Sequence, residues 1–192
     1  MFGLKRIKIK VDLRIKMYKT LIKPILLYNS STWSMSETEN NNINAFHRRQ
    51  LRVILNVKYP GIMKNKDIYH KTNEKPISLD IIASRWRLFG HTLRMNEESP
   101  AHKAMVYYFS PPTTSSFIGR PRITLPYTLS LDLEKTASNN NVEFNRYGID
   151  RLKSNKDFEK LKLLAKDRNK WKQFSMMIYK TAEAETRISE MN

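Results

Sequence analysis

The sequence predicts an all-α fold, and three observations support this prediction. Apolar residues recur every three or four positions in several long segments, which is the spacing of one face of an α-helix. No segment alternates apolar and polar residues over the length that a sheet would need. Breaks rich in Pro, Ser, Thr and Asn separate the helical segments. There are no sustained heptads and no internal repeat, so neither a coiled coil nor a solenoid is expected.

The first helix is expected to begin near Asp12, with its apolar residues roughly on one stripe. Pro24 should kink or divide this helix, because proline removes a backbone donor and clashes with the preceding turn. The Asn-Ser-Ser-Thr segment at 29–32 then ends it. The stripe consists of Leu13, Met17, Leu21 and Leu27, widened by Ile22, Ile25 and Leu26.

A second helix is expected from about Glu39 to Val57, where the Tyr-Pro-Gly segment at 59–61 ends it. A short helix from about Asn65 to His70 follows, with Asn65 as a possible cap. The second helix has an apolar face with a basic edge beside it. That face consists of Ile43, Phe46, Leu51, Ile54 and Leu55.

A third strong helix is expected to begin at Ser78, which is a good N-cap residue and has Asp80 in the following turn. Its apolar residues are spaced by four, three and four positions. Gly90 within this helix costs about 1 kcal/mol relative to Ala, so we expect close packing or a kink there. The apolar stripe consists of Ile82, Trp86, Phe89 and Leu93.

Three further helices are expected: over 100–109, from after residue 122 to about Lys135, and from about Asn155 to Ile178 or beyond. A Pro, Ser and Thr linker at about 110–118 and an Asn triplet at 139–141 separate them. The last helix should bury Phe158, Leu161, Leu164, Ala165, Trp171 and Phe174.

The charge of the chain points to a polyanionic partner. Of its 192 residues 35 are Lys or Arg and 18 are Asp or Glu, which gives a net charge of +17. Hydrophobic residues make up 40%, enough for a packed core, so a fully disordered chain is excluded. Like charges repel one another in a compact state, and nucleic acid is the leading candidate to relieve that repulsion, ahead of an anionic membrane surface. The alternative is a compositional bias of AT-rich coding DNA.

Several kinds of chemistry are excluded or disfavoured by residues that are absent. The chain has no Cys, which removes disulfides, thiolate zinc sites, iron–sulfur clusters and cysteine nucleophiles. Its five Gly residues are too dispersed for a phosphate-binding loop, and its four His residues lack metal-ligand spacing. No Asp-Asp pair suggests the clustered carboxylates of a two-metal polymerase or nuclease. We therefore expect no catalytic residues, no metal and no cofactor.

The sequence also predicts where the protein is found. The N-terminal segment alternates apolar and basic residues and lacks the unbroken apolar core of a signal peptide. No run of about 18 apolar residues occurs. The expectation is an intracellular protein, nuclear or cytoplasmic, that is neither secreted nor embedded in a membrane.

Three segments in order resemble one family. The first is 18–28 (YKTLIKPILLY), which closes at Trp33 and precedes the helix containing 50–55 (QLRVIL). The second is 85–95 (RWRLFGHTLRM), and the third is 119–122 (GRPR) with 165–171 (AKDRNKW) downstream. Their order and spacing resemble the C-terminal region of non-LTR (LINE-type) retrotransposon reverse transcriptases, from about residue 11 to residue 175.

The chain differs from the family at several positions of these segments. The family usually has Gly where this chain has Asn29, Glu at Ser31 and an aromatic at Leu125. The family's polymerase palm and endonuclease have no counterpart in the chain. The resemblance therefore implies a truncated, non-catalytic fragment of an RNA-directed DNA polymerase. Its residues 1–75 would form a thumb-like helical unit and residues 76–192 a second, basic helical unit.

The basic residues are the candidate nucleic-acid contacts. In the polymerase thumb that residues 11–58 resemble, helices lie along the template–primer duplex, which implies phosphate contacts for one basic group. Arg suits bidentate phosphate contact, whereas Lys acts more as a point charge. About half of these side chains are expected to be ordinary surface charges. The first group is Lys16, Lys19, Lys23, Arg48, Arg49 and Arg52, and the second is Arg85, Arg87, Arg94, Arg120 and Arg122.

The aromatic residues divide into two sets. Tyr28 and Trp33 are candidates for stacking on unpaired bases, and the alternative is that they anchor the turn between two helices through buried area. Trp86, Phe89 and Trp171 lie on apolar stripes and are expected in the core.

The hypothesis from the sequence is sequence-nonspecific binding of RNA, DNA or an RNA–DNA hybrid through phosphate contacts. Three alternatives stay open. One is a helical protein–protein interaction module of a ribonucleoprotein, with full-length retroelement proteins as possible partners. Another is a basic peripheral membrane protein, and the last is a translated relic without a function. The sequence does not indicate which oligomeric state the protein has.

Overall fold

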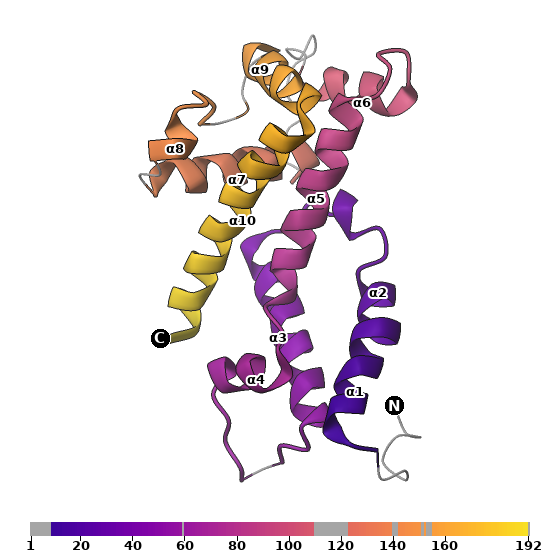
Figure 1. Cartoon of the computed structure of the whole chain (residues 1–192), viewed down its shortest axis with the longest axis vertical. Helices are drawn as coiled ribbons and strands as arrows, with labels where there is room; N and C mark the ends of the chain where they lie inside the picture. Colours follow the sequence, from indigo (N-terminus) through magenta and orange to yellow (C-terminus); the bar gives the residue numbers. More distant parts are fainter. Residues whose placement is uncertain are drawn as a thin grey trace, which may run out of the picture.

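The computed structural model describes residues 9–58, 60–109, 123–139, 142–150, 152 and 155–191. Regular structure within these ranges is helical without exception, which confirms the all-α prediction (Figure 1). No helix in the described ranges is long and apolar enough to cross a membrane. The helices are α1 (Val11–Met17), the π-helix η1 (Tyr18–Ile22), α2 (Lys23–Leu26), the 3₁₀-helix η2 (Ser30–Thr32), α3 (Glu37–Ile54), α4 (Asn65–Thr72), α5 (Ile77–Leu93), α6 (Pro100–Phe109), α7 (Leu125–Ser138), α8 (Val142–Asn145), α9 (Asn155–Lys166) and α10 (Arg168–Met191).

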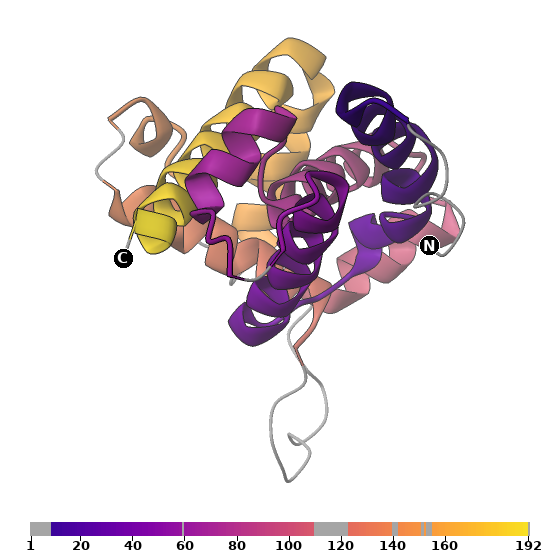
Figure 2. The same cartoon turned by 90° about the horizontal axis from the view of Figure 1, so that it is seen from below.

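Helix α5 is central to the arrangement (Figure 1). Helices α1 to α4 lie around its first half, and α6, α7, α9 and α10 lie around its second half. Trp171 at the start of α10 lies at Gly90, and Glu183 further along α10 pairs with Lys75 just before α5. Helix α10 therefore runs antiparallel to α5. Seen from below, α4 lies beside α10 while α1 lies on the other side of the molecule (Figure 2).

Pro24 divides the first helix, as predicted, and the division takes the form of a π-helix. Proline at 24 cannot donate a backbone hydrogen bond and crowds the carbonyl four residues earlier. The chain accommodates this by widening one turn, so the Lys23 N–H donates to the Tyr18 carbonyl, five residues back. The predicted apolar stripe is only partly correct, because Ile15 and Tyr18 are buried while Leu13 and Leu21 are exposed.

Helix α3 begins at a capping box. The Ser36 side chain accepts from the Glu39 N–H, and the Glu39 carboxylate accepts from the Ser36 N–H at 2.7 Å. The helix ends at Ile54, close to the predicted bounds. Helix α4 extends to Thr72 and ends where Asn73 takes a left-handed conformation.

Helix α5 begins one residue before the predicted cap, with Pro76 at the N-cap position, so the prediction that Ser78 caps it is wrong. A residue from α3 binds this end instead. The Asn44 side chain accepts from the Ser78 N–H at 3.1 Å and donates to the Ser78 hydroxyl at 3.0 Å. Both side chains are buried, so α3 supplies the polar contacts that the first turn of α5 needs.

The predicted C-terminal helix is in fact two helices, α9 and α10, divided at Asp167. The Asp167 carboxylate accepts from the N–H groups of Asn169 and Lys170, at 2.9 and 3.1 Å. This is the N-cap arrangement, and it starts a new helix in a new direction. Helices α6 and α7 occur where expected, whereas α8 was not predicted. The predicted linker at 110–118 lies outside the described residues.

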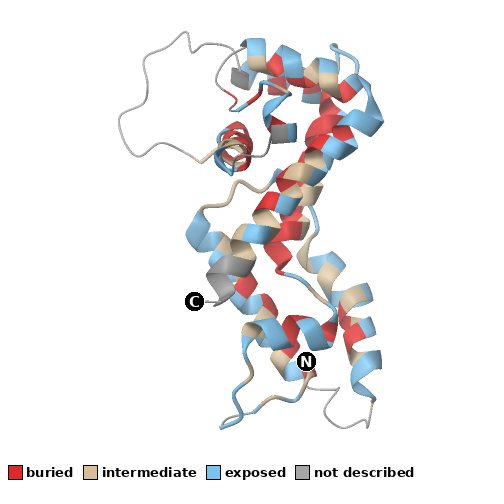
Figure 3. Cartoon of the chain, turned by 60° about the vertical axis from the view of Figure 1, so that its left-hand side comes forward, coloured by how far each residue is buried: buried red, intermediate tan, exposed pale blue. Residues whose placement is uncertain are grey.

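The buried apolar residues form two clusters, one on each side of the predicted boundary at residue 75. The smaller lies within residues 15–69 and includes Tyr18 and Leu51. The larger lies within residues 86–178 and includes Phe174. Buried residues run along α5 between them (Figure 3). Whether the two units fold independently stays a prediction.

The larger cluster centres on aromatic rings from α5 and α10. Trp86, Phe89 and Trp171 are buried, as predicted. Their ring centroids lie 5.8 to 5.9 Å apart in tilted or edge-to-face arrangements. The close packing expected at Gly90 is confirmed, because a Cβ there would overlap the Trp171 indole. The Trp171 Nε1–H donates to the Trp86 carbonyl at 3.2 Å.

Replacing Asn44 by Ala should destabilise the protein by about 2 kcal/mol. The substitution leaves the buried Ser78 N–H and hydroxyl without their partners at the start of α5. Urea denaturation followed by circular dichroism measures the change. Asn41→Ala, at an exposed position one turn earlier in α3, is the matched control and should leave stability within about 0.5 kcal/mol of the parent. Equal effects of the two substitutions would contradict this account of Asn44.

Candidate nucleic-acid interface

Two of the predicted phosphate contacts, Lys19 and Lys23, bind a carboxylate within the protein. The Lys19 ammonium donates to the Asn73 carbonyl at 2.8 Å and lies 3.2 Å from Glu74. The Lys23 ammonium lies 2.7 Å from Glu74 and 2.8 Å from Asp80. Glu74 is nearly buried, so these lysines neutralise an internal charge. Their structural role competes with any role in phosphate binding.

Beneath these lysines lies a buried histidine that the sequence analysis did not single out. His47 has no exposed surface, and its ring lies between the rings of Tyr18 and Tyr69. The Tyr18 hydroxyl is 2.7 Å from His47 Nδ1, and Glu74 is 3.7 Å from Nε2. Burial lowers the pKa of His47 to about 4, against the opposing charge of Glu74. Burial, with a further contribution from Glu74, raises the pKa of Tyr18 to about 12. Both groups are neutral at pH 7, and neither is accessible to a substrate.

Arg85 is a core residue, so the prediction that it contacts phosphate is wrong. Its side chain is 2% exposed, and its Nη1 lies 3.1 Å from the Asp132 carboxylate on α7. The same carboxylate oxygen accepts from the Trp86 Nε1–H at 2.9 Å. Burial raises the pKa of Asp132, against the charge of Arg85, which lowers it. The pair joins α5 to α7 inside the protein.

The predicted arginines of α3 and the lysine of α1 occupy different environments. Arg52 donates to the Asn65 side chain at 2.7 Å and so joins α3 to α4. Arg48 is half-buried. Arg49 and Lys16 are exposed and form no ion pair with any described residue. Among this first group, Lys16 and Arg49 are the side chains best able to meet an external phosphate.

A basic face lies on the second half of α5. Arg87, His91 and Arg94 are separated by four and three positions and therefore share one side of the helix. Arg87 and His91 are exposed, and Arg94 is half-buried with Nη1 donating to the Ala165 carbonyl at 3.2 Å. No described carboxylate forms an ion pair with Arg87 or Arg94. Arg120 and Arg122, the other predicted contacts of this group, lie outside the described residues.

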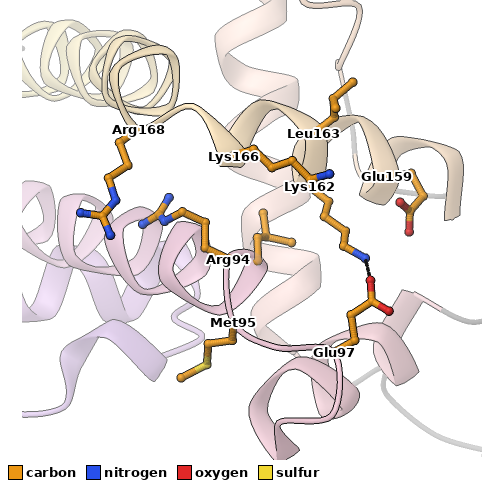
Figure 4. A pocket seen from close by; sticks show the side chains of 9 residues that line it. Arg94, Met95, Glu97, Glu159, Lys162, Leu163, Lys166 and Arg168 are labelled. Carbon is orange, nitrogen blue, oxygen red and sulfur yellow. Dashed lines mark hydrogen bonds and ion pairs between the residues drawn. The ribbon is translucent and has the colours of Figure 1, made fainter.

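The basic face ends at a pocket of about 600 Å³ (Figure 4). Figure 4 shows the side chains of Arg94 and Arg168 pointing toward each other at one side of it. Lys162 and Glu97 form an ion pair of 2.6 Å at the other side. Partial burial and then the charge of Arg168 lower the pKa of Arg94, whereas the hydrogen bond to Lys162 lowers the pKa of Glu97. The lining residues are Leu93, Arg94, Met95, Glu97, Glu159, Lys162, Leu163, Lys166 and Arg168.

The pocket's residues from α9 and α10 were not among the predicted contacts. The sequence pattern Lys166-Asp167-Arg168 predicts a solvated, charged surface. The signal that could have found them is Asp167 as a helix N-cap followed by an aromatic at Trp171. That combination places Arg168 one turn before a core residue and so at a fixed position.

The two candidate stacking residues differ in exposure. Tyr28 is 82% exposed, so the alternative that it anchors the turn through buried area is wrong for Tyr28. Trp33 is half-buried beside η2. An exposed tyrosine ring is available to a base, and stacking by Tyr28 stays a prediction.

The described residues offer anion-binding chemistry. No group of three or more His, Asp or Glu side chains in the described ranges could hold a metal ion. The cations around α5 and the pocket can instead bind phosphate oxygens through charge-assisted hydrogen bonds. Comparisons of the chain with protein-family models, with curated proteins and with solved structures found no match.

The stability of the protein should fall by about 3 kcal/mol as the pH is lowered from 6.5 to 4, through His47 alone. The unfolded chain takes up a proton near pH 6.5, whereas the folded protein resists protonation until about pH 4. The contribution of His47 is therefore complete above pH 6.5 and is lost as the pH falls through this window. Urea denaturation across the window measures it.

The control for this experiment compares two histidines. His47→Gln should remove most of the pH dependence in this window, because glutamine does not titrate. His70→Gln changes an exposed histidine on α4 and should keep the pH dependence of the parent. If His47→Gln retains the full slope, His47 does not cause the pH dependence and this account of the histidine is contradicted.

Proposed function

We propose that the protein binds nucleic acids without sequence preference, through their backbone phosphates. The observation that carries this proposal is the basic face of α5, formed by Arg87, His91 and Arg94, together with Arg168 beside Arg94. The three arginines lack ion pairs with the described carboxylates. Seven residues of an α-helix span about 10 Å, which corresponds to roughly three base-pair steps of a duplex. The face is long enough to meet several phosphates.

The overall charge supports the same proposal. With 35 basic and 18 acidic residues, the chain cannot neutralise its cations internally. Several carboxylates are already used inside the fold, since Glu74 binds two lysines and Asp132 binds Arg85. The remaining cations repel one another unless a polyanion binds. Phosphate contacts of this kind carry affinity without reading sequence.

The resemblance to LINE-type reverse transcriptases is a second support. The segment 85–95 that carries part of this resemblance includes the whole basic face of α5. Enzymes of that family act on RNA and DNA, so RNA, DNA or an RNA–DNA hybrid is the proposed partner. The proposal includes no polymerase or nuclease step. Its phosphate contacts are Lys16, Arg49, Arg87, Arg94 and Arg168.

A second candidate function rests on exposed apolar side chains of η1, α2 and the turn that follows α2. Leu21, Ile25 and Tyr28 are spaced by four and three positions and are 55%, 75% and 82% exposed. Exposed apolar side chains grouped along one segment favour contact with another protein. The two candidates separate by mutation. Arg87→Gln should leave binding to a protein partner unchanged, whereas Ile25→Ser should weaken it and spare nucleic-acid binding.

The proposed function predicts a strong salt dependence of binding. If the protein contacts about six phosphates of a B-DNA duplex, log affinity should fall with log salt at a slope of about −5. Arg87→Gln should weaken binding to unrelated sequences equally and make the slope less steep by about 0.9. Fluorescence anisotropy with short duplexes over a salt series measures both quantities.

The matched control is Lys135→Gln. Lys135 is an exposed cation on α7 that pairs with Glu185 at 3.9 Å, and α7 packs on a different side of α5 from Arg87. The Lys135→Gln protein should show the same slope of log affinity against log salt as the parent protein. A slope near zero for the parent protein, or no binding at low salt, would overturn the proposed function.

A further inference from the structure

The pocket at the end of α5 differs from the rest of the basic face, because it is concave and is built by separate elements. Arg94 is the C-cap residue that follows α5, Lys162 and Lys166 come from α9, and Arg168 begins α10. Its volume of about 600 Å³ falls within the range of small-molecule sites. Such an open pocket can contact a group from several elements at once, whereas an exposed helix face can only lie along one.

The charge within the pocket favours an anion. Four cationic side chains line it against two carboxylates, those of Glu97 and Glu159. Glu97 is bound to Lys162, whereas Arg94 and Arg168 form no ion pair with any described residue. The two guanidinium groups nevertheless point toward each other (Figure 4). Two like charges held this way repel, and an anion between them would remove that repulsion.

The fold fixes the Arg94 side chain and the backbone position of Arg168 before any ligand binds. Arg94 is half-buried and donates to the Ala165 carbonyl at the end of α9. Arg168 lies one turn before Trp171, whose indole is fixed against α5. The first N–H groups of α10 are not available to a ligand, because the Asp167 carboxylate already accepts from two of them. The anion site is therefore made by side chains rather than by the helix end.

The far side of the pocket is crossed by an ion pair. Lys162 on α9 and Glu97 in the turn after α5 meet at 2.6 Å, opposite the two arginines (Figure 4). Leu93 and Met95 add apolar lining next to Arg94. An anion bound between the two arginines leaves this ion pair intact.

We propose that this pocket binds the terminal phosphate of a nucleic-acid strand, between Arg94 and Arg168, an inference that rests on the proposed function. A terminal phosphate monoester carries a charge of about −1.5 to −2 at pH 7 and three free oxygens, whereas an internal phosphodiester carries one negative charge. Two guanidinium groups match the terminal group because each can bind oxygens in a bidentate manner. The basic face of α5 then binds the phosphates next to the terminal phosphate along the strand.

The test compares single strands of one sequence that differ only at their ends. Binding by the full chain is measured by fluorescence anisotropy for strands with a 5′-phosphate, a 3′-phosphate or hydroxyl groups at both ends. One phosphorylated strand should bind at least about tenfold more tightly than the hydroxyl strand, which is the effect of a charged hydrogen-bonding pair. Inorganic phosphate in excess should compete with that strand and leave the hydroxyl strand bound.

Two variants of α10 test whether the pocket causes the preference for a phosphorylated strand. Arg168→Gln should abolish the preference for the phosphorylated strand, and it should weaken the binding of both strands to one common affinity because Arg168 is also one of the proposed backbone contacts. Lys172→Gln is the matched control, since Lys172 is an exposed cation one turn further along α10 that does not line the pocket. It should keep the preference. Arg168 is exposed, so its replacement is not expected to impair folding.

The outcomes distinguish this inference from the proposed function. Equal affinity of the parent protein for all three strands would overturn the terminal-phosphate site and leave nonspecific binding intact. A preference that survives in Arg168→Gln would also overturn it, because the phosphate would then be bound elsewhere. Binding of none of the strands at low salt would overturn the proposed function and the site with it.

Discussion

The Trp171 indole lies against Gly90, and the packing of α10 on α5 depends on this contact. No side chain fits at position 90, because a Cβ would overlap the indole. The Nε1–H of that ring donates to the Trp86 carbonyl of α5, which fixes the rotation and register of α10 on α5. Arg168, one turn before Trp171, is thereby held beside Arg94, one turn after Gly90. The geometry of the pocket is therefore a consequence of how two helices pack.

The scarcity of carboxylates decides which cations are free for a partner. Glu74 and Asp132 are buried or nearly so, and each must be neutralised from within, by Lys19 and Lys23 in one case and by Arg85 in the other. In the part of the chain that the structure describes, most of the other cations face solvent. The structure thus separates positive charges that maintain the fold from positive charges such as Arg87 that are available to phosphate. Net charge alone does not make this distinction.

Local features of the fold could be predicted from the sequence. Apolar spacing and breaker residues locate the helices, Pro24 divides the first of them, and Gly90 marks a close approach. These signals lie within a few residues of the feature they determine. Burial of the central aromatic residues follows from the same periodicity.

Features that depend on distant residues could not be predicted in this way. The start of α5 is bound by Asn44, and Arg85 is buried because Asp132 on another helix neutralises it. Tyr28 is 82% exposed, whereas the sequence left both an exposed stacking role and a buried anchoring role open. For the candidate interface, sequence spacing identified Arg87 and Arg94, but Arg168 joins Arg94 only through the packing of α10 on α5.

The stability of Gly90→Ala tests the central contact most directly. Helix propensity alone would make this substitution stabilising by about 1 kcal/mol. If the Trp171 indole occupies the space above Gly90, the free energy of unfolding should instead fall by about 2 kcal/mol or more, because the added methyl group overpacks the core. His91→Ala, on the exposed face of the same helix, should change it little. A Gly90→Ala protein as stable as the parent, or more stable, would contradict the account.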